Sequence, residues 1–479
     1  MATNRLKGDD CERDWIWERE VEAAPWEETR RISAGAWERQ YRRLRESSPF
    51  YARKFKEAGV GNSFVSLGDL TQLPFTTKPE LKQALDEDPP FGSNLCVSPD
   101  QVKRVYQTSG TSGVPSVLAL TRGDMETWTL MGTRTYYATG IHEHSSVLTT
   151  FGAGPFVAGH THFVLLRIGV RSVPVAPGDT ERVVYGLRAG LADTLLSTAS
   201  FAQYLANRWE KDSPSPPRGA ISRRGTRVPN ALRAQGREEG RGQGLTHVVT
   251  GGEPGGGIPA IRDHIQSALG VTVTEVMGIG DIAPSLFGEC THQQGMHFCG
   301  AGHVWVEMID PETEEPVEIE TGAEGELVYT TLTREAMPVV RFRGGDIARI
   351  EGTSCECGRT SFRQRVLGRR DDMFIVRGVN VYPTAILAVV GDFRPRVTGR
   401  ARVVREGSST SIEPPIPIEV EVTERHESNP ALVAEIESAI RSKLMFRGRV
   451  KLVPESDFGE AGYKTNLTRK APSPPRGEG

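Results

Sequence analysis

Apolar and polar residues along the first sixty positions recur with the spacing of helices. Residues 15 to 58 carry tryptophans, tyrosines and phenylalanines among arginines and glutamates, which is typical of amphipathic helices. Between residues 102 and 204, apolar runs such as SSVLTTF and RSVPVAP alternate with helical stretches such as TERVVYGLRAGLA. This alternation is typical of βαβ units, so we expect a parallel or mixed sheet with covering helices.

In the second half of the chain, the sequence pattern predicts an insertion, a β-rich lobe and a second domain. Residues 211 to 244 are rich in Pro, Gly and Arg and poor in large apolar residues, which predicts a disordered insertion. The runs HVWVEMID and GELVYTTL then predict a small β-rich lobe. We therefore predict a large α/β domain over residues 1–367 and a small α+β domain over 368–479, ending in a floppy tail at 471–479.

Composition narrows the class of protein. With 479 residues, the chain exceeds what one hydrophobic core usually supports. It has no apolar run near 18 residues, and its N-terminus is charged throughout, so we expect a cytoplasmic protein without a membrane span or a secretory signal. A net charge of -3 argues against general nucleic-acid binding. Any anionic ligand must therefore be held by local donors.

The clearest chemical signal is the loop TSGTSGVP, which runs from Thr108 to Pro115. Hydroxyls and bare backbone N–H groups suit phosphate oxygens, and glycine allows successive N–H groups to converge on an anion. The loop has no Walker lysine, and an ordinary Ser/Gly-rich turn would have the same composition. Taken alone, the loop leaves both interpretations open.

An ordered set of motifs gives this loop a context. TSGTSGVP is followed by GGEP at 251–254, MGIGD at 277–281, RFRGGD at 341–346, GRRDDMFIVRGVNVYP at 368–383 and a C-terminal lysine. This order resembles the adenylate-forming superfamily, and YARKFKEAGV, LPFTTKPEL and REAMPVVRFRGGDIARI are most similar to phenylacetate-CoA ligase and its relatives. The resemblance spans roughly residues 38 to 466. It implies the adenylate-forming fold, in which a small C-terminal domain moves against a large α/β domain.

The resemblance implies a role for each motif. The residues that would hold the phosphates of ATP are Ser109, Gly110, Thr111, Ser112 and Gly113. The residues that would line the adenine and ribose sites are Gly252, Glu253, Pro254, Met277, Gly278, Asp346 and Arg369. Asp371 would be the hinge of the small domain, although surface ion pairs are an alternative for this charged run. Lys464 would be the catalytic lysine that reaches both the attacking carboxylate and the α-phosphate.

Two motifs depart from the family pattern. The usual aromatic-Gly-x-Ser/Thr-Glu is replaced by MGIGD, so Met277 offers no aromatic ring and Gly280 no hydroxyl. Asp281 still offers a hard oxygen, and we predict it as the Mg²⁺ ligand, with a helix N-cap as the alternative. Tyr463 interrupts the usual Gly-Lys pair before Lys464, which leaves Lys470 as a rival.

Cysteines and histidines suggest a second metal. Cys290, His292 and His297 lie some sixty residues before a Cys-x-Cys pair. The pair does not have the spacing of a standard zinc knuckle, and buried free thiols are the alternative. If zinc is bound, the predicted ligands are Cys290, His297, Cys355 and Cys357. Four protein ligands leave no open position, so the zinc would be structural.

The resemblance as a whole implies an AMP-forming ligase. It would activate phenylacetate or a related aryl acid with ATP and Mg²⁺ and pass the acyl group to coenzyme A, as in phenylacetate catabolism. One alternative transfers the acyl group to a carrier-protein thiol or another acceptor, and a second is a degenerate, non-catalytic nucleotide-binding protein. The expected partners are small molecules, without nucleic acid or membrane, and a homodimer is left open.

Overall fold

A computed structural model of the protein describes residues 16–108, 116–152, 154, 156–176, 178–212, 244–376, 379–405, 412–422, 429–458 and 467–470. The predicted insertion begins at residue 211, but α8 (Ala199–Asp212) continues through residue 212. The rest of that insertion up to residue 243, and the predicted tail at 471–479, lie outside the described residues. Of the helices within the described ranges, none has both the length and the apolar character that crossing a bilayer requires.

The N-terminal region is helical, as its periodicity predicts. It contains α1 (Arg19–Glu22), α2 (Trp26–Ser47), α3 (Pro49–Glu57), the short η1 (Leu67–Gln72), α4 (Lys78–Glu87) and the short η2 (Pro99–Gln101). Ser48 accepts a hydrogen bond from the backbone N–H of Tyr51 at the start of α3, and Thr77 with Glu80 forms a capping box at the start of α4. Five of the aromatic side chains pack into one core, namely Trp37, which is fully buried, Tyr41, Phe50, Tyr51 and Phe55.

A 12-stranded sheet forms the centre of the molecule, in the order β11-β10-β12-β13-β14-β9-β8-β7-β6-β5-β3-β4. Its parallel strands are β3 (Ser146–Thr149), β4 (Arg171–Pro174), β5 (Thr194–Ser197), β6 (His247–Gly251) and β7 (Thr272–Ile279). They are connected by η3 (Val157–His160), α6 (Thr161–Ile168), α7 (Thr180–Arg188), α8 and α9 (Pro259–Leu269). β5 is buried at every position, as expected for a parallel strand covered on both faces. The predicted βαβ arrangement is confirmed.

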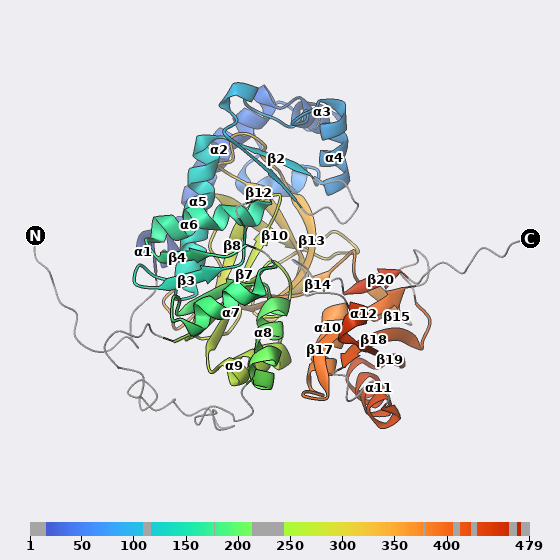
Figure 1. Ribbon diagram of the computed structural model, residues 1–479. Coiled ribbons are helices and arrows are strands. Elements are labelled where there is room, and N and C mark those ends of the chain that lie inside the picture. Colours follow the sequence, from blue (N-terminus) through green and yellow to red (C-terminus); the bar gives the residue numbers. More distant parts are fainter. Residues whose placement is uncertain are drawn as a thin grey trace, which may run out of the picture.

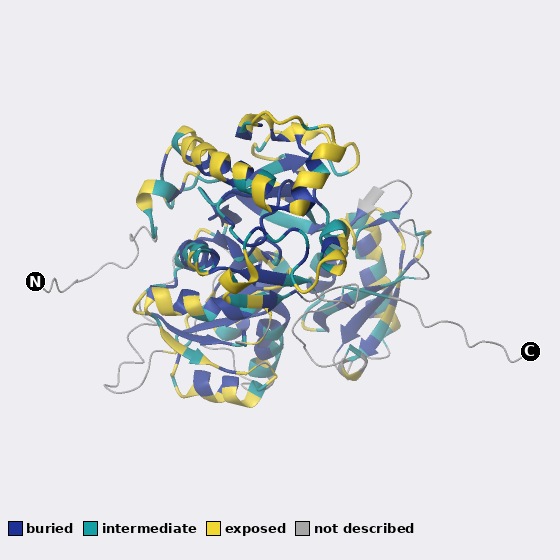
Figure 2. Ribbon diagram, turned by 90° about the horizontal axis from the view of Figure 1, so that it is seen from above, coloured by how far each residue is buried: buried dark blue, intermediate teal, exposed yellow. Residues whose placement is uncertain are grey.

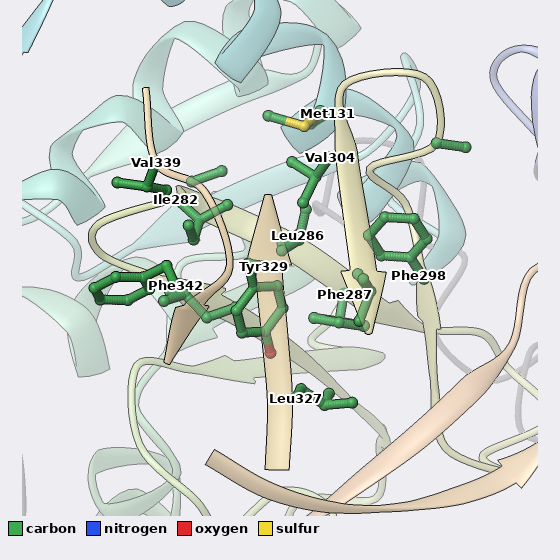
Figure 3. Packing of buried hydrophobic residues seen from close by; sticks show 14 of the residues in the cluster. Met131, Ile282, Leu286, Phe287, Phe298, Val304, Leu327, Tyr329, Val339 and Phe342 are labelled. Carbon is green, nitrogen blue, oxygen red and sulfur yellow. The ribbon is translucent and has the colours of Figure 1, made fainter. Parts of the chain in front are cut away.

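The β-rich region predicted after this point is the antiparallel half of the same sheet. It consists of β8 (Ala283–Glu289), β9 (Met296–Phe298), β10 (Val304–Ile309), β11 (Pro316–Val317), β12 (Glu324–Thr331), β13 (Phe342–Gly352) and β14 (Arg363–Arg369). Helix α5 (Arg122–Ala138) packs against β8. Figure 3 shows the core between them, where Met131 of α5 lies near Val304 and Leu286.

The C-terminal elements form a smaller sheet with its own core. They are β15 (Phe374–Val376), β16 (Val379–Val381), α10 (Pro383–Gly391), β17 (Val397–Arg405), β18 (Ile416–Val422), α11 (Pro430–Leu444), β19 (Gly448–Pro454), α12 (Glu455–Phe458) and β20 (Thr468–Lys470). Four of these strands pair in the order β19-β18-β17-β20 and share a hydrophobic core with α10 and α11. Figure 1 shows this orange and red part beside the larger one, and in Figure 2 both parts have buried sheets and exposed outer helix faces. The predicted boundary at residue 368 falls within β14.

Candidate active site and metal centre

The predicted phosphate loop starts and ends on a two-stranded hairpin. Strands β1 (Arg104–Gln107) and β2 (Val117–Leu120) are antiparallel, and Gln107 pairs with Val117. The backbone N–H of Thr108 donates to the Ser116 carbonyl at 3.0 Å, and the Ser116 N–H donates to Thr108 Oγ1 at 3.3 Å. These bonds hold the two ends of the loop together. The predicted phosphate ligands between them lie outside the described residues.

Three of the predicted motifs meet beside this hairpin. A Cβ atom on Gly280 would lie 2.9 Å from Thr108 Cγ2, and one on Gly344 would lie 3.9 Å from Ile279 Cγ2. Thr108 of TSGTSGVP therefore contacts MGIGD, and RFRGGD lies next to MGIGD, although the three motifs are far apart in the sequence. The contact also explains a departure from the family pattern, because Ser or Thr at position 280 would force Thr108 to move.

Asp281 occupies the turn between the antiparallel strands β7 and β8. No helix begins there, so the N-cap alternative is wrong. Its side chain is 8% exposed, and Lys78 Nζ lies 3.6 Å from its Oδ2. The buried Arg334 donates from Nη1 to the Ile282 carbonyl at 3.0 Å, which fixes the backbone next to Asp281.

Lys78 is a candidate that the sequence did not reveal. It lies in LPFTTKPEL, which contributed only to the family resemblance. The capping box of Thr77 and Glu80 can be recognised from the sequence and predicts a helix start at this position. That the helix start faces Asp281 follows only from tertiary packing.

The GGEP motif begins with Gly251, the last residue of β6. Gly252 has a φ of 84°, a conformation that favours glycine. Glu253 Oε1 accepts a hydrogen bond of 2.7 Å from the backbone N–H of Ser200, at the start of α8. Glu253 and Pro254 line a cavity whose opposite wall comes from the C-terminal part, including Leu467. The predicted adenine loop therefore lies at the boundary between the two parts of the chain.

A buried charge network supports the backbone behind GGEP. Arg262 donates from Nε to the Gly256 carbonyl at 2.7 Å and forms an ion pair with the buried Glu289. Burial, and next the nearby Glu289, raise the pKa of Glu275 to about 7. This network could not be predicted from local sequence, because each of its residues would suit an exposed surface equally well.

The remaining predicted nucleotide residues form two groups. Met277 lies in β7, and Gln364 Nε2 donates to its sulfur at 3.4 Å. Asp346 and Arg369 are paired residues of β13 and β14. Arg369 donates from Nη1 to Asp346 Oδ1 at 3.3 Å, and from Nε and Nη2 to the two carboxylate oxygens of Asp371 at 2.8 and 3.1 Å. A carboxylate has about four acceptor positions, so Asp346 can also accept hydrogen bonds from ligand hydroxyls.

Gly278 lies where two chain segments almost touch. A Cβ atom there would lie 2.0 Å from the Pro284 carbonyl oxygen, so no side chain fits. Lys464 lies outside the described residues. Leu467, which follows it, lines the cavity beside Glu253, and β20 pairs in parallel with β17.

The four predicted zinc ligands come together. The sulfur atoms of Cys290, Cys355 and Cys357 and a ring nitrogen of His297 all lie within 4.8 Å of one another. Cys290 Sγ is 3.7 Å from Cys355 Sγ, and Cys357 Sγ is 3.4 Å from His297 Nε2. Tetrahedral zinc with Zn–S bonds of about 2.3 Å places its ligand atoms about 3.8 Å apart. The spacing of these atoms therefore fits a zinc ion.

Strand pairing explains why these four side chains meet. Cys290 follows β8, His297 lies in β9, and the two other cysteines lie in the turn between β13 and β14. β9 pairs with both β8 and β14. The remaining candidate, His292, is not part of the cluster, and its Nδ1 lies 3.7 Å from Glu356.

Comparison with known proteins gives consistent results. No model of a protein family matches the chain. The chain is 34% identical over 416 residues to the phenylacetate-coenzyme A ligase of Thermus thermophilus, covering 85% of each protein. It is 31% identical to the phenylacetate-coenzyme A ligase of Escherichia coli, covering 71% of each.

Solved structures of 2-hydroxyisobutyryl-CoA ligase have the same fold. In its postadenylation state, with R3-HIB-AMP, the TM-score is 0.81 at 24% identity, covering 98% of this chain and 95% of that one. In the thioesterification state, with 2-HIB-AMP and CoA, the TM-score is 0.65 at 26% identity, with 98% and 94% covered.

Fold and motifs together define the class as AMP-forming acid–thiol ligases with the adenylate-forming architecture. Within that class, the chain belongs to the phenylacetate-CoA ligase family. The family expected from the order of the motifs is therefore confirmed.

Proposed function

We propose that the protein activates an aryl or arylacetic acid, phenylacetate first among them, with ATP. Acyl-AMP and diphosphate form in the first half-reaction, and coenzyme A then displaces AMP to give the thioester. The contact of Thr108, the first residue of the phosphate-loop motif, with MGIGD carries this proposal, because RFRGGD lies next to MGIGD and the predicted metal and ribose residues are thus near the start of that motif. The two relatives named phenylacetate-coenzyme A ligase support the acid.

Each predicted residue around the nucleotide would have a separate role. Asp281 fits a magnesium ion, because its carboxylate is buried, offers hard oxygen ligands and directly follows Gly280, which contacts Thr108 at the start of the phosphate-loop motif. Bound Mg²⁺ would neutralise negative charge on the phosphates. Asp346 would accept hydrogen bonds from the ribose hydroxyls, and Lys464 would neutralise charge that develops between carboxylate and α-phosphate.

The small domain would serve the two half-reactions in two orientations, turning about Asp371. The higher TM-score with the postadenylation state, 0.81 against 0.65, supports the first of these orientations for the described structure. The location of Leu467 beside Glu253 supports it as well, because it keeps the segment after Lys464 next to the predicted adenine loop.

Incubating the protein with ATP, Mg²⁺ and a set of acids, with and without coenzyme A, tests the proposed function. We expect phenylacetate or a related aryl acid to stimulate diphosphate exchange into ATP, and acyl-CoA to form only when coenzyme A is present. Exchange without consumption of coenzyme A would favour a carrier-protein acceptor. Absence of exchange with every acid would favour the non-catalytic alternative.

Lys78 is expected to bind the phosphates of ATP, because its ammonium lies beside Asp281. A hydrogen bond to a charged group contributes about 1.5–3 kcal/mol, so Lys78→Met should raise the KM for MgATP roughly 10- to 100-fold. The KM for the acid should change little. Lys82→Met, on the same helix α4, is the matched control. If Lys78→Met and Lys82→Met had the same KM for MgATP, Lys78 would not bind the phosphates.

We also propose a structural zinc ion held by Cys290, His297, Cys355 and Cys357. Support comes from the separation of their ligand atoms, all within 4.8 Å. The cluster links the turn between β13 and β14 to β9, so the ion would stabilise the antiparallel half of the sheet. A cytoplasmic location is part of the proposal, since none of the five described cysteines forms a disulfide, as in a reducing compartment.

A further inference from the structure

The two parts of the chain meet closely along α9 and α10. A Cβ atom on Gly391, the last residue of α10, would lie 2.6 Å from the Cβ of Ala260 in α9. Ile258, just before α9, packs against both the core of the C-terminal part and the core around α8 and α9. Any rotation of the C-terminal part must separate these surfaces.

A polar cluster lies at the same interface. Arg394, between α10 and β17, donates from Nη1 to Asn207 Oδ1 of α8 at 2.9 Å. The same oxygen lies 2.9 Å from His264 Nε2 of α9. Arg394 also donates from Nη2 to the Thr398 carbonyl. One amide oxygen thus joins α8, α9 and the C-terminal part.

Arg394 is a cation held mainly by neutral acceptors. Within the described part of the chain, its guanidinium forms no ion pair, and its Nε is shielded from water without an acceptor. Burial lowers the pKa of Arg394 to about 10, although Glu210 and Glu421 act in the opposite direction. Removing a cation from water costs free energy that neutral acceptors offset only in part. Arg394 therefore makes this interface less stable than an apolar side chain of similar length would.

We propose that Asn207 and Arg394 form a releasable latch that sets the balance between the two orientations of the C-terminal part. Asn207 stabilises the described orientation by accepting from Arg394, while the desolvation of Arg394 keeps that orientation from becoming permanent. In an orientation that separates α9 from α10, the guanidinium regains water. The latch rests on the proposed function, because that function requires both orientations.

The two latch residues should have opposite effects when replaced. Asn207→Leu leaves the half-buried donors of Arg394 and His264 without their shared acceptor, and unpaired donors kept from water destabilise the orientation that shields them. This variant should slow acyl-AMP formation roughly 5- to 10-fold and should not slow thioester formation from supplied acyl-AMP. Arg394→Met removes the partly buried charge but leaves Asn207 with His264. It should preserve acyl-AMP formation and slow thioester formation roughly 5- to 10-fold.

The experiment measures both half-reactions for the two variants and, independently of activity, hydrogen exchange in α9 and α10. We expect faster exchange in Asn207→Leu and slower exchange in Arg394→Met than in the parent protein. Arg396→Met is the matched control, because that nearby arginine pairs with Glu435 within the C-terminal part and is 38% exposed. It should change neither half-reaction.

The outcomes separate the latch from the proposed function. Effects of the same sign in both variants, or unchanged exchange in α9 and α10, would overturn the latch. Equal losses in both half-reactions with a lower melting temperature would also overturn it, because they indicate a purely structural role. Failure of the parent protein to catalyse either half-reaction would contradict the proposed function, while opposite exchange effects would still support the latch.

Discussion

Replacement of Lys464 by alanine should slow acyl-AMP formation by on the order of 100-fold or more, about 3 kcal/mol. The reason is that adenylation brings the negative carboxylate against the negative α-phosphate, and a cation that reaches both stabilises this transition state. Thioester formation from supplied acyl-AMP should remain nearly unchanged, because Lys464 is needed in only one orientation of the small domain. Acid-dependent diphosphate exchange measures the first half-reaction, and acyl-CoA formation measures the second.

Lys470→Ala is the control for this experiment. Lys470 is the last residue of β20, where it pairs with Arg405 of β17. A substitution that removes no contact with the reacting groups usually changes rates little, so both half-reactions should stay within a factor of about two. A near-normal adenylation rate in Lys464→Ala would show that the catalytic assignment is wrong. Equal impairment of both half-reactions would indicate misfolding or a small domain that cannot turn.

The fold was predictable where a local pattern decides the structure. Alternation of apolar runs and helical stretches predicted the parallel part of the sheet, because its inner strands β3, β5 and β6 are buried on both faces and read as continuous apolar segments, whereas the edge strand β4 is largely exposed. The position of β14 was not predictable. It lies between β9 and β13 in the sheet, and that order depends on pairing between segments far apart in the sequence.

The candidate site was predictable only through the order of its motifs. Asp346, Arg369 and Asp371 are individually ordinary charged residues, and their contacts arise from the register of β13 with β14. Lys78 was missed because a lysine at a helix start is usually solvated, and only packing of α4 brings it to Asp281. Arg262 and Glu275 were missed for the same reason, since burial of a charged side chain leaves no trace in local sequence.

The zinc ligands were predictable in part. The residue types limited the choice to five side chains, but the Cys-x-Cys spacing is not standard, so spacing alone did not establish a site. Pairing of β9 with β8 and β14 brings four of the five together and directs His292 towards Glu356. A metal site assembled across strands in this way can be proposed from sequence but needs the sheet register to select its members.

Changing Cys355 and Cys357 to serine should remove the proposed zinc and destabilise the protein. Structural zinc contributes about 10–16 kcal/mol of binding free energy in small zinc-finger peptides. This chain buries large cores of its own, so we expect a smaller loss, about 4 kcal/mol or more in the free energy of unfolding. The preference among acids should change far less, because the ligands lie directly after β8, in β9 and in the β13–β14 turn and not among the predicted nucleotide residues.

His292→Ala is the matched control for the zinc experiment. This histidine lies between Cys290 and His297 in the sequence, yet its side chain belongs to no cluster of ligand atoms found in the described residues. Metal analysis should give about one equivalent of zinc in the parent protein and in His292→Ala, and none in the double serine variant. In denaturant unfolding, His292→Ala should be as stable as the parent protein, and the double serine variant should be less stable. If metal analysis finds no zinc in parent protein prepared without chelators, the proposed site does not exist. If the double serine variant retains zinc, other residues bind it.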